Sequence, residues 1–245
     1  SSYSGATSIN DGILRFTADQ TLAGALNFGS ANTITTAGTL DLSNASATFG
    51  GAMLVQTDSA TNINQLLLGA SEVLTINGNV TIGTARAAST NTLFTASGGG
   101  SMMVSNAATN GVFAVGGATT AASVGNKATA DLSGLSSLII SLDPTTGVVR
   151  VNPTNGNNVS DKYSVLILPA TGAGTTTITA NLLDVGDSSQ NNNAAGQVNQ
   201  LVLGSGASTF NVNTVNIGTG GRDVGAITFG GGTGTLVLRA ADGSS

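Results

Sequence analysis

The chain has 245 residues and a formal net charge of −5, and it contains no Cys, His or Trp. Only 8% of its residues are charged, against about 25% in typical soluble domains. The 7 Lys and Arg residues are too few for the basic stripe of a nucleic-acid-binding protein or for a polybasic membrane patch, so neither partner is expected. The absence of Cys and His excludes disulfides, thiolate zinc sites and a Ser-His-Asp triad.

The remaining composition predicts an all-β protein. Hydrophobic residues make up 40% of the chain, which argues against wholesale disorder, and 35 glycines occur beside only 3 prolines. Gly, Asn and β-branched residues lower helix propensity and suit short strands joined by tight turns. No signal peptide begins the sequence and no run of eighteen apolar residues occurs, so no membrane insertion within the chain is expected.

The first elements predicted are two short strands around a turn. A strand at residues 7–9 leads into the turn Asn10-Asp11-Gly12, where left-handed backbone conformations are easily adopted, and a second strand follows. These residues resemble the passenger-associated repeat of bacterial autotransporters, with the pattern Y-[ST]-G-x-T-x-[IV]-N-x-G-x-L. The matching residues are Tyr3, Ser4, Gly5, Thr7, Ile9, Asn10, Gly12 and Leu14, whereas Ile13 stands where Thr is more usual. The resemblance implies a right-handed parallel β-helix on the outside of a bacterium, and it implies no catalytic residues.

The next hundred residues alternate apolar and polar positions. Residues 25–29, 39–43 and 73–78 are examples, each closed by Gly, Asn or Ser, which is the pattern of half-buried strands. Their spacing also fits a sandwich or a barrel. A β-solenoid is favoured because like residues stack in its ladders, where Asn, Thr and Ser can hydrogen-bond but charges would repel.

One cassette occurs twice at a constant spacing of 135 residues. Residues 64–69, 80–84 and Phe94 correspond to residues 199–204, 215–219 and Phe229. Such preserved spacing indicates repeated structural units. The predicted stacked core is Leu66, Leu68, Val80, Ile82 and Phe94 with Leu201, Leu203, Val215, Ile217 and Phe229, and the predicted corners are Gly69, Gly83, Gly204 and Gly218.

The middle of the chain changes texture. Residues 130–142 are the most apolar stretch and predict one or two core strands, whereas all three prolines, Pro144, Pro153 and Pro169, follow within a short span. Because proline removes a ladder donor, we expect residues 143–162 to form an irregular excursion or hairpin. The expected organisation is a single elongated domain, with one block of coils at 1–142, the insertion at 143–162 and a second block at 163–245.

The C-terminal region also resembles a repeat of large secreted bacterial proteins. The pattern L-x-L-G, V-x-I-G, a basic residue, I-x-F-G and L-x-L-R-x-A-D-G is met by residues 201–204, 215–218, Arg222, 227–230 and 236–243. Together with the first cassette and the opening element, the resemblance covers well over half of the chain. It supports the same expectation of a secreted β-helix.

No catalytic, cofactor-binding or metal-binding residue is expected. Residues 98–100 and 230–232 are glycine-rich turns without the Lys-Ser/Thr of a phosphate loop, and residues 220–223 form one broken copy of a calcium nonapeptide. A polysaccharide lyase or hydrolase would need clustered acids, for which Asp161, Asp184, Asp187 and Asp223 are the candidates. These aspartates sit beside turn-forming residues, where Asp is expected for its backbone hydrogen bonding, so an enzyme is not predicted.

The predicted function is structural. We expect about ten to thirteen coils of about twenty residues, forming a rod of roughly 50–60 Å on the outer surface of a bacterium. No charged or proline-rich cap is visible in residues 1–4 or 242–245, so copies are expected to stack end to end into a filament, sheath or surface layer. The alternatives are an autotransporter-type stalk and an adhesin that binds surface glycans through residues 143–162 or 187–197. A polysaccharide-degrading enzyme is a more remote alternative.

Overall fold

The computed structural model of the chain describes residues 3–29, 36–57, 61–83, 90–116, 126–152, 163–172, 174–186, 198–219, 224–231 and 233–244. These residues form 22 strands and no helix, which confirms the all-β prediction. Every strand pairing among them is parallel. Nowhere in these ranges is there a helix of the length and apolarity needed to cross a membrane.

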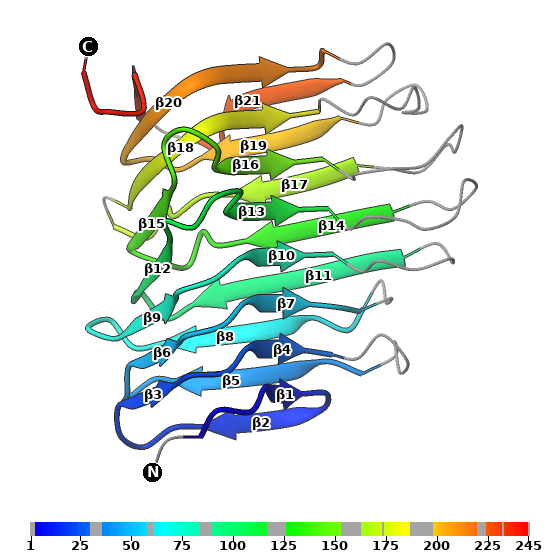
Figure 1. The fold of residues 1–245 in the computed structure, drawn as a ribbon. Helices are drawn as coiled ribbons and strands as arrows, with labels where there is room; N and C mark the ends of the chain where they lie inside the picture. The colour runs from blue at the N-terminus through cyan, green and yellow to red at the C-terminus, as the bar shows by residue number, and fades with distance from the viewer. Residues whose placement is uncertain are drawn as a thin grey trace.

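The chain runs repeatedly through two sheets, one of 14 strands and one of eight. Each passage has a first strand in the larger sheet, a second strand in the smaller sheet and a third strand back in the larger sheet. We call such a passage a layer, and eight layers follow one another from the N-terminal to the C-terminal side (Figure 1).

The strands take fixed places in the layers. First strands are β1 (Thr7–Ile9), β4 (Leu26–Phe28), β7 (Met53–Val55), β10 (Val80–Ile82), β13 (Val112–Val115) and β16 (Val148–Val151). Second strands are β2 (Gly12–Arg15), β5 (Gly38–Leu42), β8 (Asn64–Leu68), β11 (Thr90–Ser97), β14 (Asn126–Asp131), β17 (Tyr163–Ile167), β19 (Asn199–Leu203) and β21 (Gly225–Phe229). Third strands are β3 (Gln20–Leu22), β6 (Ala47–Phe49), β9 (Val73–Ile76), β12 (Ser101–Asn106), β15 (Ser137–Leu142) and β22 (Thr235–Arg239). The long strands β18 (Thr175–Val185) and β20 (Ala207–Ile217) each serve as the third strand of one layer and the first strand of the next.

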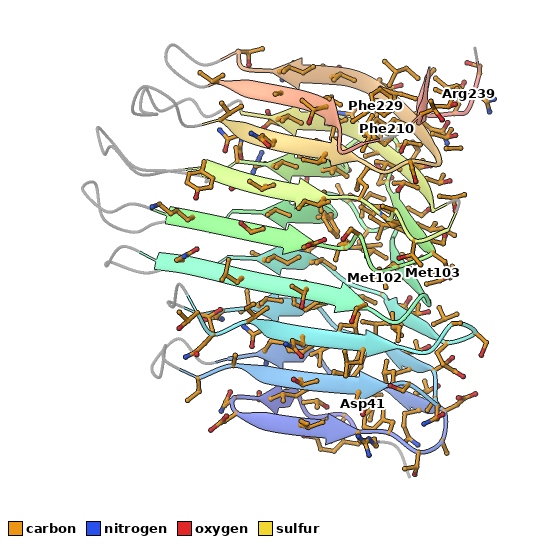
Figure 2. The ribbon with its side chains drawn as sticks, turned by 180° about the vertical axis from the view of Figure 1, so that it is seen from behind. Asp41, Met102, Met103, Phe210, Phe229 and Arg239 are labelled. Carbon is orange, nitrogen blue, oxygen red and sulfur yellow. The ribbon has the colours of Figure 1, made fainter. Side chains whose placement is uncertain are left out.

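Side chains in register form columns that run the length of the stack. One column follows Ile9, Phe28, Val55, Ile82, Val115, Val151, Val185 and Ile217. Because successive residues of a strand point to opposite faces, alternate positions face the core. Met102 is fully buried and its neighbour Met103 is exposed, and Figure 2 labels this pair on β12.

The predicted core is confirmed for seven of its ten residues. Those with at most 1% of their surface exposed are Leu66, Leu68, Val80, Ile82, Phe94, Leu201 and Leu203. The prediction is wrong for Val215, Ile217 and Phe229, because Val215 is only partly buried and the other two are about half exposed. These three residues lie in the last layer, where no further described strand covers them.

The predicted glycine corners are confirmed, since Gly69, Gly83, Gly204 and Gly218 each directly follow a strand. At Gly204 a Cβ atom would lie 1.8 Å from the carbonyl oxygen of Pro169 in the layer below. Only glycine allows the two backbones to approach so closely at this corner.

The two cassettes are not in equivalent register in the smaller sheet. Following the paired residues from Asn64 through Phe94, Ala130 and Leu166 leads to Leu201 rather than to Asn199. The second cassette is therefore displaced by two residues along its strand. A two-residue displacement keeps every side chain on the same face, so the core pattern survives.

The layers are fewer and larger than the sequence predicted. Eight layers occur rather than ten to thirteen, and the interval along the column grows from 19 residues between Ile9 and Phe28 to 36 between Val115 and Val151. At about 4.8 Å per strand, eight strands span roughly 34 Å rather than 50–60 Å. The added length lies between first and second strands, because Ile9 is followed closely by Gly12 whereas Val185 and Asn199 are far apart in sequence.

The excursion predicted at residues 143–162 is wrong for its middle part. Val148–Val151 form β16, which pairs with β13 on one side and with β18 on the other. Pro144 lies in the turn before β16, where Asp143 accepts hydrogen bonds from the backbone and side chains of Thr145 and Thr146. The proline is thus outside the ladder and does not interrupt it. Residues 153–162 lie outside the described residues.

Candidate functional site: the two end faces of the stack

The C-terminal end of the stack presents core-type side chains to solvent. Ile217, Phe229 and Leu238 are 45%, 48% and 55% exposed, although their column neighbours Val185, Leu203 and Phe210 are buried. Figure 2 shows Phe229 and Phe210 at this end of the stack and Asp41 near the other. We call the surface formed by Val215, Ile217, Phe229 and Leu238 the tail face. Its side chains lie at core positions, but no described strand lies beyond them.

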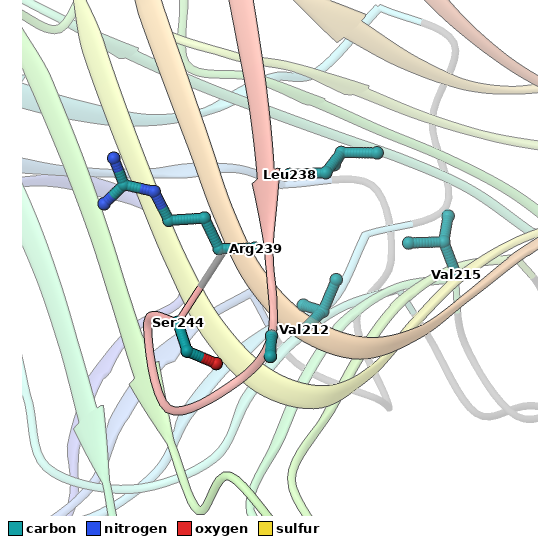
Figure 3. Close-up of a pocket in the computed structure, with 6 residues that line it drawn as sticks. Val212, Val215, Leu238, Arg239 and Ser244 are labelled. Atoms are coloured by element: carbon teal, nitrogen blue, oxygen red, sulfur yellow. The ribbon is translucent and has the colours of Figure 1, made fainter.

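A hollow of about 370 Å³ opens on the tail face. Its lining residues are Val212, Val215, Leu238, Arg239, Ala240 and Ser244. Figure 3 shows Leu238 and Arg239 pointing to opposite sides of β22, so the apolar side chain faces the core and the guanidinium faces away from it. The hollow is thus the open end of the hydrophobic core.

The N-terminal end of the stack is apolar as well. Leu14, Phe16 and Leu22 are only partly buried against the core, and we call the surface that they form with Tyr3 the head face. A hollow of about 550 Å³ opens there, lined by Tyr3, Ala6, Thr7, Ser8, Leu14, Phe16 and Leu22. The ring of Tyr3 is about half exposed, and its hydroxyl donates to the carbonyl oxygen of Ala6 at 2.8 Å. Both ends of the core are therefore accessible.

The strand edges are open at the same two places. In the smaller sheet, β2 pairs only with β5 and β21 only with β19 among the described strands, and in the larger sheet β22 pairs only with β20. The backbone groups on the outer side of such edge strands can hydrogen-bond to another strand. Each end therefore combines an apolar surface with parallel strand edges.

A charged cluster lies beside the head face, on the outer side of the smaller sheet. The Arg15 Nε donates to Asp41 Oδ2 at 2.6 Å, and the Ser43 hydroxyl and amide donate to Asp41 Oδ1 at 2.6 and 3.0 Å. The Ser43 hydroxyl, the Ser43 amide and the Arg15 guanidinium together hold the pKa of Asp41 below its ordinary value of 3.8. Since Arg15 is 64% exposed, the hydrogen bonds matter more than the ion pair.

This cluster predicts a loss of stability in acid. A carboxyl with a lowered folded-state pKa stabilises the fold above its unfolded value of about 3.8, and the contribution disappears as the pH falls through the folded pKa. Urea unfolding at several pH values should show the wild type more stable than Asp41→Asn at neutral pH, with the difference narrowing below pH 3.8. A difference that is constant down to pH 2 would contradict this assignment.

The acidic candidates do not converge within the described residues. Asp184 was expected in a turn, and this is wrong, because it lies in β18 and is buried. Its Oδ2 accepts from Arg150 Nε and from Asn152 Nδ2, both at 3.2 Å. Asp161, Asp187, Asp223 and residues 187–197 lie outside the described residues. In the described ranges no three Asp or Glu side chains group in a way that could hold a metal ion.

Two buried asparagines escaped the sequence reasoning. Asn64 Oδ1 accepts from the amide of Gly38 at 2.9 Å, and Asn199 Oδ1 accepts from the amide of Ser164 at 2.8 Å. Both side chains are at most 1% exposed, and each satisfies a backbone donor of the preceding layer. The signal was present, because Asn is the first residue of both cassettes and stands at an in-facing position.

Comparisons of the chain with family models, with curated proteins and with solved structures gave no significant match. The resemblance to autotransporter-associated repeats therefore depends on the residues of the repeats themselves.

Proposed function

We propose that the chain is a right-handed parallel β-helix that acts as a structural subunit of the bacterial cell exterior. In this proposal, copies associate end to end into a filament, sheath or surface layer. The observation that carries the proposal is the pair of end faces, where side chains at core positions such as Phe229 and Leu238 are half exposed. Covering them with another layer would continue the packing found inside the stack.

The magnitudes favour a reversible contact. Full burial of one large apolar side chain contributes about 1.5–3 kcal/mol, so half-exposed Ile217, Phe229 and Leu238 contribute together roughly 3 kcal/mol. Association costs about 4–15 kcal/mol in lost freedom of motion. The head-face side chains and the open strand edges must supply the rest, so we expect assembly to depend on concentration.

The two faces differ, which sets the form of the assembly. All strands are parallel, so the head face carries β1 to β3 and the tail face carries β21, β22 and the second half of β20. A contact between different faces of identical copies leaves a free face at each end and adds copies without limit unless the assembly closes into a ring. A linear filament is the simplest outcome.

The extracellular location is supported by the repeat resemblance in residues 3–14 and 201–243. The low charge of 8% suits ladders of like residues, in which charges would repel. Stability without disulfides is consistent with a long series of stacked layers, each of which buries the core of the last.

Sedimentation velocity over a wide concentration range, combined with electron microscopy, tests this function. We expect the wild type to sediment faster as its concentration rises and to form rods, and Leu238→Asp to remain monomeric because it places a charge on the tail face. The matched control is Ser141→Asp, an exposed outward position on β15 in mid-stack, which should assemble like the wild type. Wild-type protein that is monomeric at every concentration would overturn the proposal and favour a stalk whose faces are covered by layers of its own chain.

A further inference from the structure

Three columns run unbroken from the head face to the tail face. The first joins Ile9 to Ile217 on the core side of the larger sheet. The second joins Leu22 to Leu238, also on the core side. The third lies on the outer side of the smaller sheet and joins Ile13 to Thr228. Each core column thus begins and ends with a large aliphatic residue.

We propose that the partner of the tail face is the head face of a second copy, joined in the register of these columns. Ile217 then lies next to Ile9, Leu238 next to Leu22 and Thr228 next to Ile13. This inference rests on the proposed end-to-end association and specifies its geometry. The joint becomes one more strand pairing in each sheet, with the same parallel direction as the pairings inside the stack.

The register is compatible with the charges at both ends. The outward residues that would meet are uncharged, namely Ser8 with Asn216, Ile13 with Thr228 and Thr21 with Val237. Counting on from these pairs, Arg15 meets Gly230 and Arg239 meets Ala23, so no like charges face each other. A slip by one residue would turn the core side chains of one copy outward, which excludes odd registers.

One corner of the joint has room for only one of two segments. Residues 3–6 lie against the corner after β3, where Ala23 donates its amide to the Tyr3 carbonyl and Thr7 donates to the Ala25 carbonyl. Residues 240–244 continue past β22 in the same way, and Ala241 donates its amide to Asn213 Oδ1 at 3.1 Å. In the proposed register the two segments of neighbouring copies occupy the same corner. A variant that ends at Arg239 should therefore join more readily than the full chain.

Disulfide cross-linking measures the register directly, because the chain contains no cysteine. Neighbouring strands lie about 4.8 Å apart, which is within the range of about 4.4–6.8 Å between the Cα atoms of a disulfide. We expect a variant carrying both Ile13→Cys and Thr228→Cys to form a ladder of covalent oligomers under mild oxidation. Mass spectrometry should identify the linked peptides as 13 with 228. Ile13 is 66% exposed and Thr228 is exposed, so neither change should disturb folding.

The matched control carries Ile13→Cys and Ala226→Cys, which tests a slip of two residues on the same outer face. In the proposed register these Cα atoms are more than about 7 Å apart and little cross-linking is expected. If the protein associates but the 13–226 pair links faster than the 13–228 pair, the register is overturned while end-to-end association stands. If neither variant nor the wild type associates at any concentration, the proposed function itself fails.

Discussion

Phe94→Ala is expected to lower the free energy of unfolding by about 3–5 kcal/mol, the usual cost of removing a buried Phe side chain. Phe94 is 1% exposed, and its ring meets that of Phe28 edge to face with centroids 5.5 Å apart. Alanine would remove this aromatic contact and leave a cavity between neighbouring layers. Urea unfolding followed by circular dichroism measures the loss.

Phe229→Ala is the matched comparison, because Phe229 occupies the position of Phe94 in the second cassette. Phe229 is 48% exposed on the tail face, so we expect a loss of only about 1 kcal/mol in the monomer. The same variant should weaken end-to-end association. Equal losses of stability for Phe94→Ala and Phe229→Ala would contradict the difference in burial between the two layers.

Asn64→Leu is expected to destabilise the fold by about 2–5 kcal/mol, although it adds apolar volume to the core. The substitution leaves the Gly38 amide without its acceptor and removes the donor to Thr57 Oγ1, which Asn64 Nδ2 reaches at 3.0 Å. A buried polar group left without a partner costs about 1–3 kcal/mol, and two such groups are affected. Thermal or urea unfolding measures the change.

Gln65→Leu provides the control for Asn64→Leu. Gln65 follows Asn64 in β8 but faces outward in the column of Thr39, so the same kind of change removes no buried hydrogen bond. We expect the free energy of unfolding of Gln65→Leu to stay within about 0.5 kcal/mol of the wild type. If both variants lose equal stability, the buried role of Asn64 is wrong.

Local pattern was enough to predict most strands. The alternation of apolar and polar residues marks Leu66 and Leu68 as facing the core, and both are buried. The same alternation cannot show what lies above a side chain. Ile217 and Phe229 have the same local sequence signals as Ile82 and Phe94, yet they are half exposed, because burial requires another layer on each side.

Pairing partners were beyond the reach of the repeat alone. The constant spacing of 135 residues suggests that Leu66 and Leu201 are equivalent, but they stand in different columns of the smaller sheet. The difference arises because the connections between strands vary in length from layer to layer. A connection can change length without altering the alternation within the strands it joins.

The sequence by itself determined the all-β class, the in-facing positions, the glycine corners and the absence of His and Cys chemistry, because these follow from residue type and from neighbours a few positions away. Only the tertiary structure decided the number of layers, the register between them, the roles of Asn64 and Asp184, and the exposure of core-type residues at the two end faces. Each of these depends on a strand that is stacked directly above or below but lies 19 to 36 residues away in the chain. No local pattern specifies such a contact, and it is at the ends of the stack that the missing contact exposes the apolar surface on which the proposed assembly depends.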